Sequence, residues 1–500
     1  MGIKAALSKP YAKFIVKGIY KDAKRAVDCQ KEVFNDLIRQ GAKTAFGKDH
    51  GFANIESPKE FRQRVPVVDY EDLTIYITRA KNGESDILWP GKPMYFCKTS
   101  GTTSGTKFIP LTKDSMPNHI HGARNALLCH IANSNASGFV DGKMIFLQGS
   151  PELHYLESGI PYGRLSGIVA HHVPAYLQKN RMPSFETNCI DDWELKVDTI
   201  VEETIKEDMT LISGIPAWVQ MYFERILEKT GKKKIAEVFP NFDLFVYGGV
   251  NFEPYRQRFE QLIGKPIPSV ELYPASEGFI AYQDAKVEDG LLLNINSGIW
   301  FEFIPADKFF DENPPRLSLE DVEIGVNYAL IINSNAGLWG YSIGDTIKFV
   351  SLDLPRIKVT GRIKHFTSAF GEHVIAEEVE AAMAEVLLSF KAKVSEFHVA
   401  PQVSPAAGLP YHEWFIEFEE MPDSLEEMAL ELDKRMCQMN PYYLDLIQGN
   451  ILRTVVITPL PSGAFHGYMK SKGKLGGQNK LPRLGNDRQM AEVLEKYSLT

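Results

Sequence analysis

The segment from Cys97 to Thr112, CKTSGTTSGTKFIPLT, contains a dense set of groups that could bind phosphate. Between Thr99 and Lys107 it holds several Ser and Thr hydroxyls, two glycines and one lysine. Hydroxyl donors, free backbone N–H groups and an ammonium group suit a phosphate chain. A Walker P-loop is excluded, because Gly101 and Gly105 are one residue too close and a proline-containing strand pattern follows the lysine. Two interpretations stay open from this segment alone: a strand–loop–strand clamp on the β- and γ-phosphates of ATP, and a turn without a ligand.

Two carboxylates farther along the chain bear on that choice. Glu277 follows Ser276 in "VELYPASEGF", after a strand-like segment, and Asp345 follows Gly344 in "GYSIGDTIKFV", just before another strand. A lone carboxylate in a turn is usually a cap or a solvated charge. The order of the motifs is more informative: hydroxyl loop, aromatic–Ser–Glu, Gly–Asp, and then Gly–Arg at residues 361–362.

Composition excludes several classes of protein. The chain has 500 residues, 44% of them hydrophobic and 24% charged, and a formal net charge of −9, which gives no basic footprint for nucleic acid. Five scattered cysteines without a C-x-x-C pair argue against disulfides and zinc and favour a reducing compartment. No apolar run reaches the ~18 residues of a membrane span. We therefore expect a cytoplasmic protein with no nucleic-acid and no membrane partner; its oligomeric state is not indicated.

Hydrophobic patterning predicts an α/β fold with two domains. Helical spacing is present from Asp22 to Gln40 and after the hydroxyl loop, while "GKMIFLQGS", "MTLISGIPAW" and "FDLFVYGGV" are typical of buried strands. The pattern changes near residue 356. We expect a large N-terminal domain, 1–360, and a smaller α+β domain, 361–500. Gly361 at the border permits either a hinge or an ordinary turn.

The smaller domain has a compact predicted order of elements. We expect helices at 376–390 and 424–439, and strands at 396–403, 412–419 and 451–459.

Taken together, these motifs resemble the adenylate-forming superfamily, and more closely the Gretchen-Hagen family of acyl acid amido synthetases, which join acids such as auxin or jasmonate to amino acids. The likeness runs from about Phe96 to Arg483. It includes "WFEFIP", "LEDVEIGVNYAL", "NAGLWGYSIGD" and the lysine-bearing "GQNKLPR". The resemblance implies a large N-terminal α/β domain of adenylate-forming type with a smaller, mobile C-terminal α+β domain.

The resemblance also implies which residues bind ATP. The phosphates would be held by Thr99, Ser100, Gly101, Thr102, Thr103 and Lys107. Gly248 and Gly249 would let the backbone approach the adenine, and Tyr273 would lie against its face. Asp345 would accept hydrogen bonds from the ribose hydroxyls, with Arg362 nearby.

Three further residues would serve the reaction itself. Ser276 would lie near the α-phosphate or the acyl carboxylate, Glu277 would ligate Mg²⁺, and Lys480 would reach the α-phosphate and the reacting carboxylate. These residue types fit the chemistry, because a carboxylate attacking a phosphate brings two anions together and needs positioning and positive charge. No general base is needed for a carboxylate nucleophile.

The implied function is an ATP- and Mg²⁺-dependent ligase that activates a carboxylic acid as its acyl-adenylate, releases pyrophosphate and passes the acyl group to an amino acid amine. An acyl-CoA synthetase-like ligase and a non-catalytic nucleotide-binding regulatory protein stay as alternatives. Arg124, three residues after His121 on a predicted helix, could hold the acyl carboxylate or be a surface arginine. The chain departs from the plant pattern at Trp339-Gly340 and at Pro274-Ala275, so the acid is not named.

Overall fold

The computed structural model describes residues 2–100, 106–173, 178–190, 193–249, 252–363, 366–367, 369–372, 374–471 and 481–498. Its contacts divide the chain into two compact units. Unit 1 comprises 1–214, 225–249 and 263–363, and unit 2 comprises 215–224, 250–262 and 364–500. The predicted mobility of a domain that begins at residue 361 stays a prediction.

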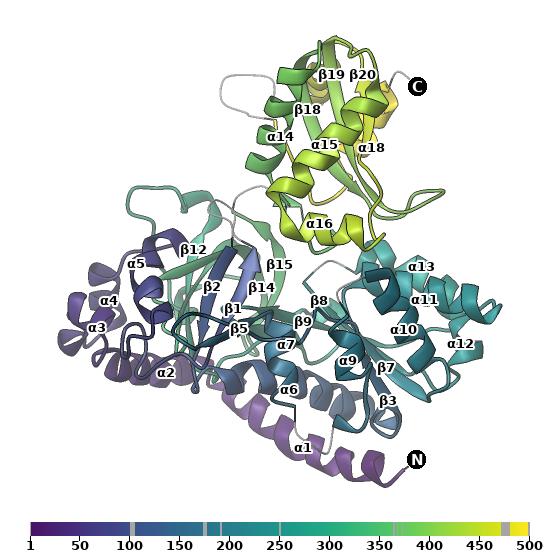
Figure 1. The fold of residues 1–500 in the computed structure, drawn as a ribbon. Helices are drawn as coiled ribbons and strands as arrows, with labels where there is room; N and C mark the ends of the chain where they lie inside the picture. Colours follow the sequence, from purple (N-terminus) through teal and green to yellow (C-terminus); the bar gives the residue numbers. More distant parts are fainter. Residues whose placement is uncertain are drawn as a thin grey trace. The chain divides into compact units, whose positions relative to one another are not determined.

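A large mixed β-sheet forms the centre of unit 1 (Figure 1). Its strands, in spatial order and among the described residues, are β12 (Ile299–Pro305), β13 (Asn327–Ser334), β14 (Tyr341–Ser351), β15 (Arg356–Arg362), β11 (Leu291–Leu293), β10 (Gly278–Gln283), β9 (Ser269–Ala275), β8 (Leu244–Gly248), β7 (Met209–Ser213), β3 (Lys143–Phe146) and β6 (Arg181–Met182).

The sheet has a parallel part and an antiparallel part. Strands β9, β8, β7, β3 and β6 run parallel, and the pairs from β9 through β12 are antiparallel. Strands β7 and β8 are buried along almost their whole length, as expected of parallel strands covered on both faces. The three strands predicted from apolar runs are confirmed as β3, β7 and β8.

A second sheet of unit 1 carries the hydroxyl segment. Its order is β2 (Thr106–Leu111), β1 (Tyr95–Ser100), β5 (Pro161–Gly163) and β4 (His154–Tyr155). Strands β1 and β2 are antiparallel, with Thr99 opposite Lys107. The expected strand–loop–strand arrangement is therefore confirmed for its two strands, while the connecting residues 101–105 lie outside the described part.

Helices of unit 1 flank these sheets. They are α1 (Ile3–Lys24), α2 (Ala26–Gly41), α3 (Ala45–Asp49), α4 (Pro58–Arg64), α5 (Tyr70–Lys81), α6 (Met116–Ser134), α7 (Leu165–Ala170), α9 (Phe185–Asn188), α10 (Trp193–Thr204) and α12 (Ile235–Val238), and α11 (Pro216–Thr230) and α13 (Glu253–Ile263) cross the unit boundary. The helix expected after the hydroxyl loop is confirmed as α6.

The helix expected at Asp22–Gln40 begins later than predicted. Asp22 belongs to α1, and Arg25, with φ −114° and ψ 35°, separates that helix from α2. The apolar positions from Val33 to Ile38 do face the core, where Phe34 packs edge-on against Trp300 with ring centroids 4.7 Å apart.

Unit 2 contains a three-stranded sheet, with β18 (Lys393–Gln402) antiparallel and β20 (Val456–Leu460) parallel to the central β19 (Tyr411–Glu420). Its other elements are β16 (Phe366–Thr367), β17 (Val374–Ile375), α14 (Ala376–Ser389), α15 (Leu425–Met439), α16 (Pro441–Gln448), α17 (Ala464–Ser471) and α18 (Ala491–Leu494). The predicted helices and strands are confirmed, but the last strand begins at Val456 rather than Ile451. The α/β fold class is confirmed.

Candidate active site

The hairpin of β9 and β10 presents the predicted Ser-Glu pair. Ala275 pairs with Gly278, so Ser276 and Glu277 are the two residues of the turn. Just beyond the turn, the buried side chain of Asn118 on α6 accepts from the Phe279 N–H at 2.6 Å and donates to the Phe279 carbonyl at 3.3 Å. This double hydrogen bond fixes the hairpin to the helix and thereby positions both turn residues.

The predicted ribose-binding aspartate is held by two neighbours. Asp345 on β14 pairs directly with Arg362 on β15, and the Arg362 Nε lies 2.6 Å from Asp345 Oδ1. The Tyr273 hydroxyl on β9 donates to Asp345 Oδ2 at 2.5 Å. Gly344, just before Asp345, has φ +81°, a conformation that favours glycine. The sequence had suggested that the Gly–Asp pair comes just before a strand, but in the structure the pair lies inside β14.

Lys107, near the start of β2, lies beside the N-terminus of α5. Its Nζ is 5.4 Å from the centre of the Tyr70 ring, and the Tyr70 hydroxyl accepts from the Phe108 N–H at 3.0 Å. Asp69 caps α5 through the N–H groups of residues 71 and 72. Asp69 and Tyr70 were not predicted as site residues, although the D-x-x-D capping pattern is visible in the sequence.

Burial and mutual charge tie four of these residues into one electrostatic site. Burial raises the pKa of Glu277, and Lys107 and Arg362 oppose that rise, whereas Asp345 adds to it. Burial lowers the pKa of Lys107, and Glu277 opposes that shift. Burial disfavours charge on Arg362, but Asp345, Tyr273 and Glu277 together outweigh burial, so the pKa of Arg362 is raised. We call Lys107, Glu277, Asp345 and Arg362 the charge cluster.

Cys97 on β1 is a contact of the site that the sequence did not reveal. Its Sγ lies 3.1 Å from the Ser276 Oγ. The thiol is buried, and burial raises the pKa of Cys97 to about 12. Because the thiolate is the nucleophilic form, this cysteine orients Ser276 rather than reacting.

Gly248 allows a close approach between β8 and β9. A Cβ at this position would lie 2.5 Å from the Leu272 carbonyl oxygen and 3.1 Å from the Pro274 Cδ. Any other residue would push away the strand that carries Tyr273. Gly249 follows with φ +81°, so both glycines are required by the backbone at this strand end.

A buried polar network holds the start of β14, the strand that carries Asp345. Glu302 on β12 is fully buried and accepts from Arg62 at 2.8 Å, Arg316 at 2.5 Å and the Asn333 amide at 2.9 Å. The same Asn333 side chain accepts from the Gly340 N–H at 2.6 Å. The network therefore fixes the turn from which β14 starts, and two motifs of the sequence contain parts of it: Glu302 lies in "WFEFIP" and Gly340 in "NAGLWGYSIGD".

Arg124 is a predicted site residue that the structure does not join to the charge cluster. Among the described residues, the Arg124 guanidinium hydrogen-bonds Asn125 on the same helix, at 3.0 and 3.3 Å, and contacts none of the cluster. Gly101, Thr102, Thr103 and Lys480 lie outside the described residues, as does the side chain of Ser100. The roles assigned to all site residues stay predictions.

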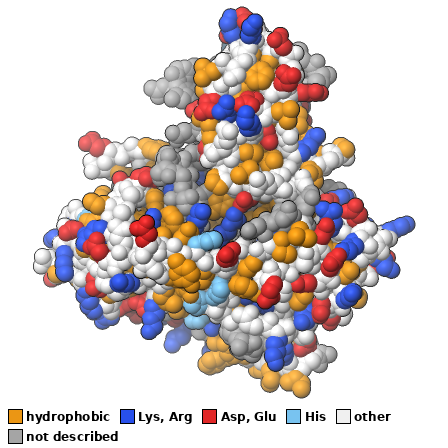
Figure 2. Space-filling view, in the orientation of Figure 1, with side chains coloured by type: hydrophobic (Ala, Val, Ile, Leu, Met, Phe, Trp, Pro, Cys, Tyr) orange, Lys and Arg blue, Asp and Glu red, His pale blue; other side chains and the backbone are white. Residues whose placement is uncertain are grey.

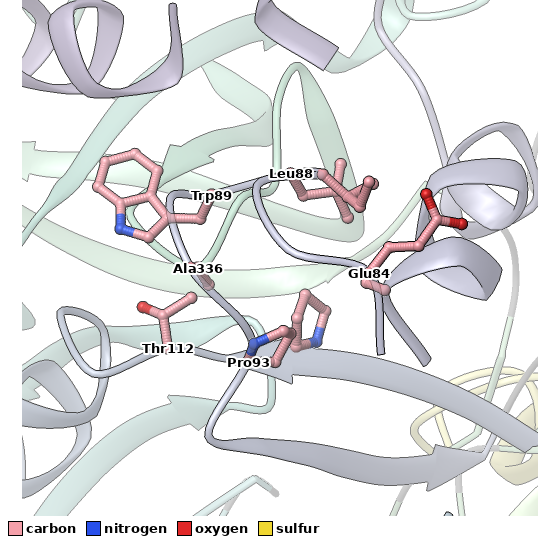
Figure 3. Close-up of a pocket in the computed structure, with 10 residues that line it drawn as sticks. Glu84, Leu88, Trp89, Pro93, Thr112 and Ala336 are labelled. Carbon is pink, nitrogen blue, oxygen red and sulfur yellow. The ribbon is translucent and has the colours of Figure 1, made fainter. Parts of the chain in front are cut away.

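A small pocket of unit 1 lies apart from this site (Figure 3). Its walls include Glu84, Leu88, Trp89, Thr112 and Ala336, and its cavity volume is about 10 Å³. That volume is close to the minimum for one water molecule, so the pocket is a packing gap and not a substrate site.

Comparison with known proteins assigns the chain to a protein family. The "GH3 family N-terminal domain" model matches residues 15–191 and 165–268, the central-domain model matches 292–362, and the C-terminal-domain model matches 377–489. The chain belongs to the GH3 family. This confirms the predicted amido synthetase family of the adenylate-forming superfamily.

Curated relatives of this GH3 chain are similar along most of its length. Indole-3-acetic acid-amido synthetase GH3.3 of Arabidopsis thaliana is 23% identical over 93% of the chain and 90% of that protein. Jasmonoyl-L-amino acid synthetase JAR4 of Nicotiana attenuata is 21% identical over 92% of the chain and 91% of that protein.

Solved structures show the same fold. The AtGH3.15 acyl acid amido synthetase in complex with 2,4-DB covers 97% of the chain and 96% of its own, with TM-score 0.62 and 16% identity. A 2-hydroxyisobutyryl-CoA ligase covers 96% and 91%, with TM-score 0.55 and 13% identity. The comparisons confirm the predicted enzyme class, an adenylate-forming ligase, and the predicted function as an acyl acid amido synthetase.

Proposed function

We propose that this GH3 protein uses ATP to convert a small carboxylic acid into its acyl-adenylate, with release of pyrophosphate, and then joins the acyl group to the amine of an amino acid. The observation that carries the proposal is the charge cluster, in which residues from three distant segments meet beside the Ser276-Glu277 turn. A nucleoside triphosphate suits this set, because a cation can neutralise its phosphates while one carboxylate holds a metal ion and the other binds the ribose.

Each residue of the cluster has a task that its contacts support. Lys107 supplies positive charge to the phosphates. Asp345, already oriented by Tyr273 and Arg362, offers its oxygens to the ribose hydroxyls. Ser276, oriented by Cys97, lies beside Glu277 and would be near the α-phosphate or the reacting carboxylate. Their contribution is positioning and stabilisation of charge on phosphorus.

Glu277 also fits a magnesium ion. Among the described residues, no group of three or more His, Cys, Asp or Glu side chains could hold a metal. Mg²⁺ at phosphates needs only one or two carboxylates, and burial of Glu277 leaves its negative charge incompletely compensated. Glu277 would hold the ion, which would neutralise phosphate charge when bound.

The C-terminal domain has a proposed part in the reaction. Lys480 would approach the α-phosphate and the acyl carboxylate during the first step and withdraw for the second, by rotation about Gly361-Arg362. In the described structure, Gly361 has φ +148°, and Arg362 is paired with Asp345 on β14. A Gly361→Pro change should therefore slow turnover; unchanged steady-state rates would contradict the rotation.

Exchange of labelled pyrophosphate into ATP tests the first step. We expect exchange that depends on an added carboxylic acid, and the acid is found by screening acids for AMP release. Lys107→Met should lower exchange by roughly 10²–10³-fold, the usual effect of removing one charge-stabilising donor. Lys98→Met, an exposed lysine on the neighbouring β1, is the matched control and should be neutral. Absence of exchange with every acid would refute the function.

The acceptor is tested separately by mass spectrometry of the products. Amino acids and coenzyme A are offered together to enzyme already loaded with acyl-adenylate. An acyl–amino acid amide supports the proposal, whereas an acyl-CoA thioester as the sole product would place the chain among CoA ligases. A reducing cytosol stays our prediction for its location, and it agrees with the five free cysteines.

A further inference from the structure

Helix α1 has hydrophobic residues on two opposite faces. Ala5, Ala12, Val16 and Ala23 are buried, and the first turn is held to the protein where the N–H groups of Gly2 and Ala5 donate to the Asp141 carboxylate at 2.5 and 3.2 Å. Near the other end, the Tyr20 hydroxyl accepts from the Asn133 amide at 2.9 Å. The inner face therefore fixes α1 against unit 1.

The outer face carries a second set of hydrophobic residues, which we call the outer stripe: Ile3, Leu7, Tyr11 and Phe14. Their exposed fractions are 81%, 66%, 48% and 75%. At about 100° per residue, these side chains fall within an arc of about 80° opposite the buried face, along about 16 Å of helix. In Figure 2, hydrophobic side chains appear along the lower edge, where Figure 1 places α1.

The charge of α1 is opposite to that of the chain. Between Ile3 and Lys24 it has six lysines and one aspartate, a formal charge of +5, whereas the chain as a whole has −9. The lysines are at positions 4, 9, 13, 17, 21 and 24. Three of them, Lys13, Lys17 and Lys24, project along one border of the outer stripe by the same helical spacing. A continuous apolar stripe beside lysines needs an occupant that is apolar and anionic.

We propose that α1 is a membrane-surface helix, whose outer stripe inserts into the interface of a bilayer that contains anionic phospholipids while its lysines contact the headgroups. Interfacial helices combine these two properties. A second copy of the chain is the less suitable occupant, because pairing two outer stripes would bring two sets of lysines together. No helix among the described residues is long and apolar enough to cross a membrane. Our expectation of no membrane partner considered only such spans, which an interfacial helix does not need.

Co-sedimentation of the full-length chain with vesicles tests the proposal. We expect binding to phosphatidylcholine vesicles containing one third phosphatidylglycerol, and little binding to phosphatidylcholine alone. Leu7→Ser/Phe14→Ser should weaken binding roughly tenfold or more, because two exposed apolar side chains are lost. Lys13→Glu/Lys17→Glu should weaken it by a similar factor and reduce its dependence on salt.

Matched controls lie on other exposed surfaces of the same unit. Ile75→Ser, on α5 with 68% exposure, and Lys232→Glu/Lys233→Glu should leave binding unchanged. Gly18→Leu should strengthen binding, because a Cβ there meets nothing within 4 Å and its helical position falls within the stripe. Thermal melts confirm folding of each variant.

Three results would overturn the proposal. The first is a wild-type chain that does not sediment with anionic vesicles. The second is equal binding by the wild type and the Leu7→Ser/Phe14→Ser variant. The third is a wild-type dimer in solution that this double variant converts to a monomer, because the stripe would then bind a second copy. None of these results bears on pyrophosphate exchange, which tests the proposed reaction.

Discussion

Replacing Asn118 by alanine tests whether α6 positions the catalytic hairpin. Asn118 provides the acceptor for the Phe279 N–H at 2.6 Å, two residues after Glu277. The Phe279 carbonyl would keep its hydrogen bond from Asn294 at 3.1 Å, so the change leaves one buried donor, the Phe279 N–H, without its acceptor. A buried donor without an acceptor costs about 1–3 kcal/mol, and the free energy of unfolding should fall by that amount.

Asn294→Ala is the matched control, since it removes the same atoms and one bond to the same residue but leaves the Phe279 N–H satisfied. It should cost only about 0.5–1.5 kcal/mol. Urea unfolding measures both values. Acid-dependent pyrophosphate exchange should fall by up to roughly 10²-fold for Asn118→Ala, because displacing reacting groups by about 1 Å has effects of that size. An Asn118→Ala variant as stable and as active as Asn294→Ala would refute the positioning argument.

Three further predictions follow from the same site and its helix. Tyr273→Phe removes the hydrogen bond to Asp345, worth about 1.5–3 kcal/mol for a charged acceptor, so the KM for ATP in pyrophosphate exchange should rise at least roughly tenfold; an unchanged KM would count against Asp345 as a ribose ligand. Glu277→Gln should abolish most exchange yet raise the melting temperature in neutral buffer without ligands, because the raised pKa of Glu277 means that folding becomes less favourable as pH rises above the ordinary carboxyl range; equal melting temperatures in neutral buffer would contradict this sign. Burial lowers the pKa of His119 from 6.5 to about 4. Protonation of this ring therefore favours the unfolded chain, so the free energy of unfolding should decrease by about 3 kcal/mol as the pH falls from above 6.5 to 4. His119→Leu should flatten that acid decrease in urea titrations, His154→Leu on the exposed β4 should not, and identical acid profiles for both would show the reasoning to be wrong.

The motif order in the sequence predicted which distant residues come together. Lys107, Glu277, Asp345 and Arg362 were all named from short motifs, and the structure brings them into one electrostatic site. Strand and helix types followed from apolar runs and helical spacing, because these patterns reflect burial directly. The roles of these residues were implied by resemblance and not by the patterns themselves.

What the sequence did not predict depends on tertiary contacts. Cys97 contacts Ser276 across 179 positions of the chain, and no local pattern encodes that distance. Asp69 reaches the site because the preceding Val68 bridges to Tyr341 on β14, a pairing of segments more than two hundred residues apart.

Helix α1 was missed for a different reason. With apolar residues on its inner and outer faces alike, its sequence shows no single hydrophobic side, so the usual periodicity is weak. The early start assigned to α2 has a local cause, since only the backbone angles of Arg25 reveal the break between the two helices.

The two-residue turn at Ser276-Glu277 limits how sequences of this type can change in length. Side chains alternate between the faces of a strand, so one residue inserted or deleted between Tyr273 and Phe279 would turn the side chains beyond it to the opposite face of the sheet. The register shift between Phe279 and Ala281 shows that β10 accommodates an extra residue only after this segment. Related proteins should therefore accumulate their insertions elsewhere and keep the spacing from Tyr273 to Phe279 invariant. Anyone who grafts another acid specificity onto this scaffold can exchange loops freely only if that spacing is left intact.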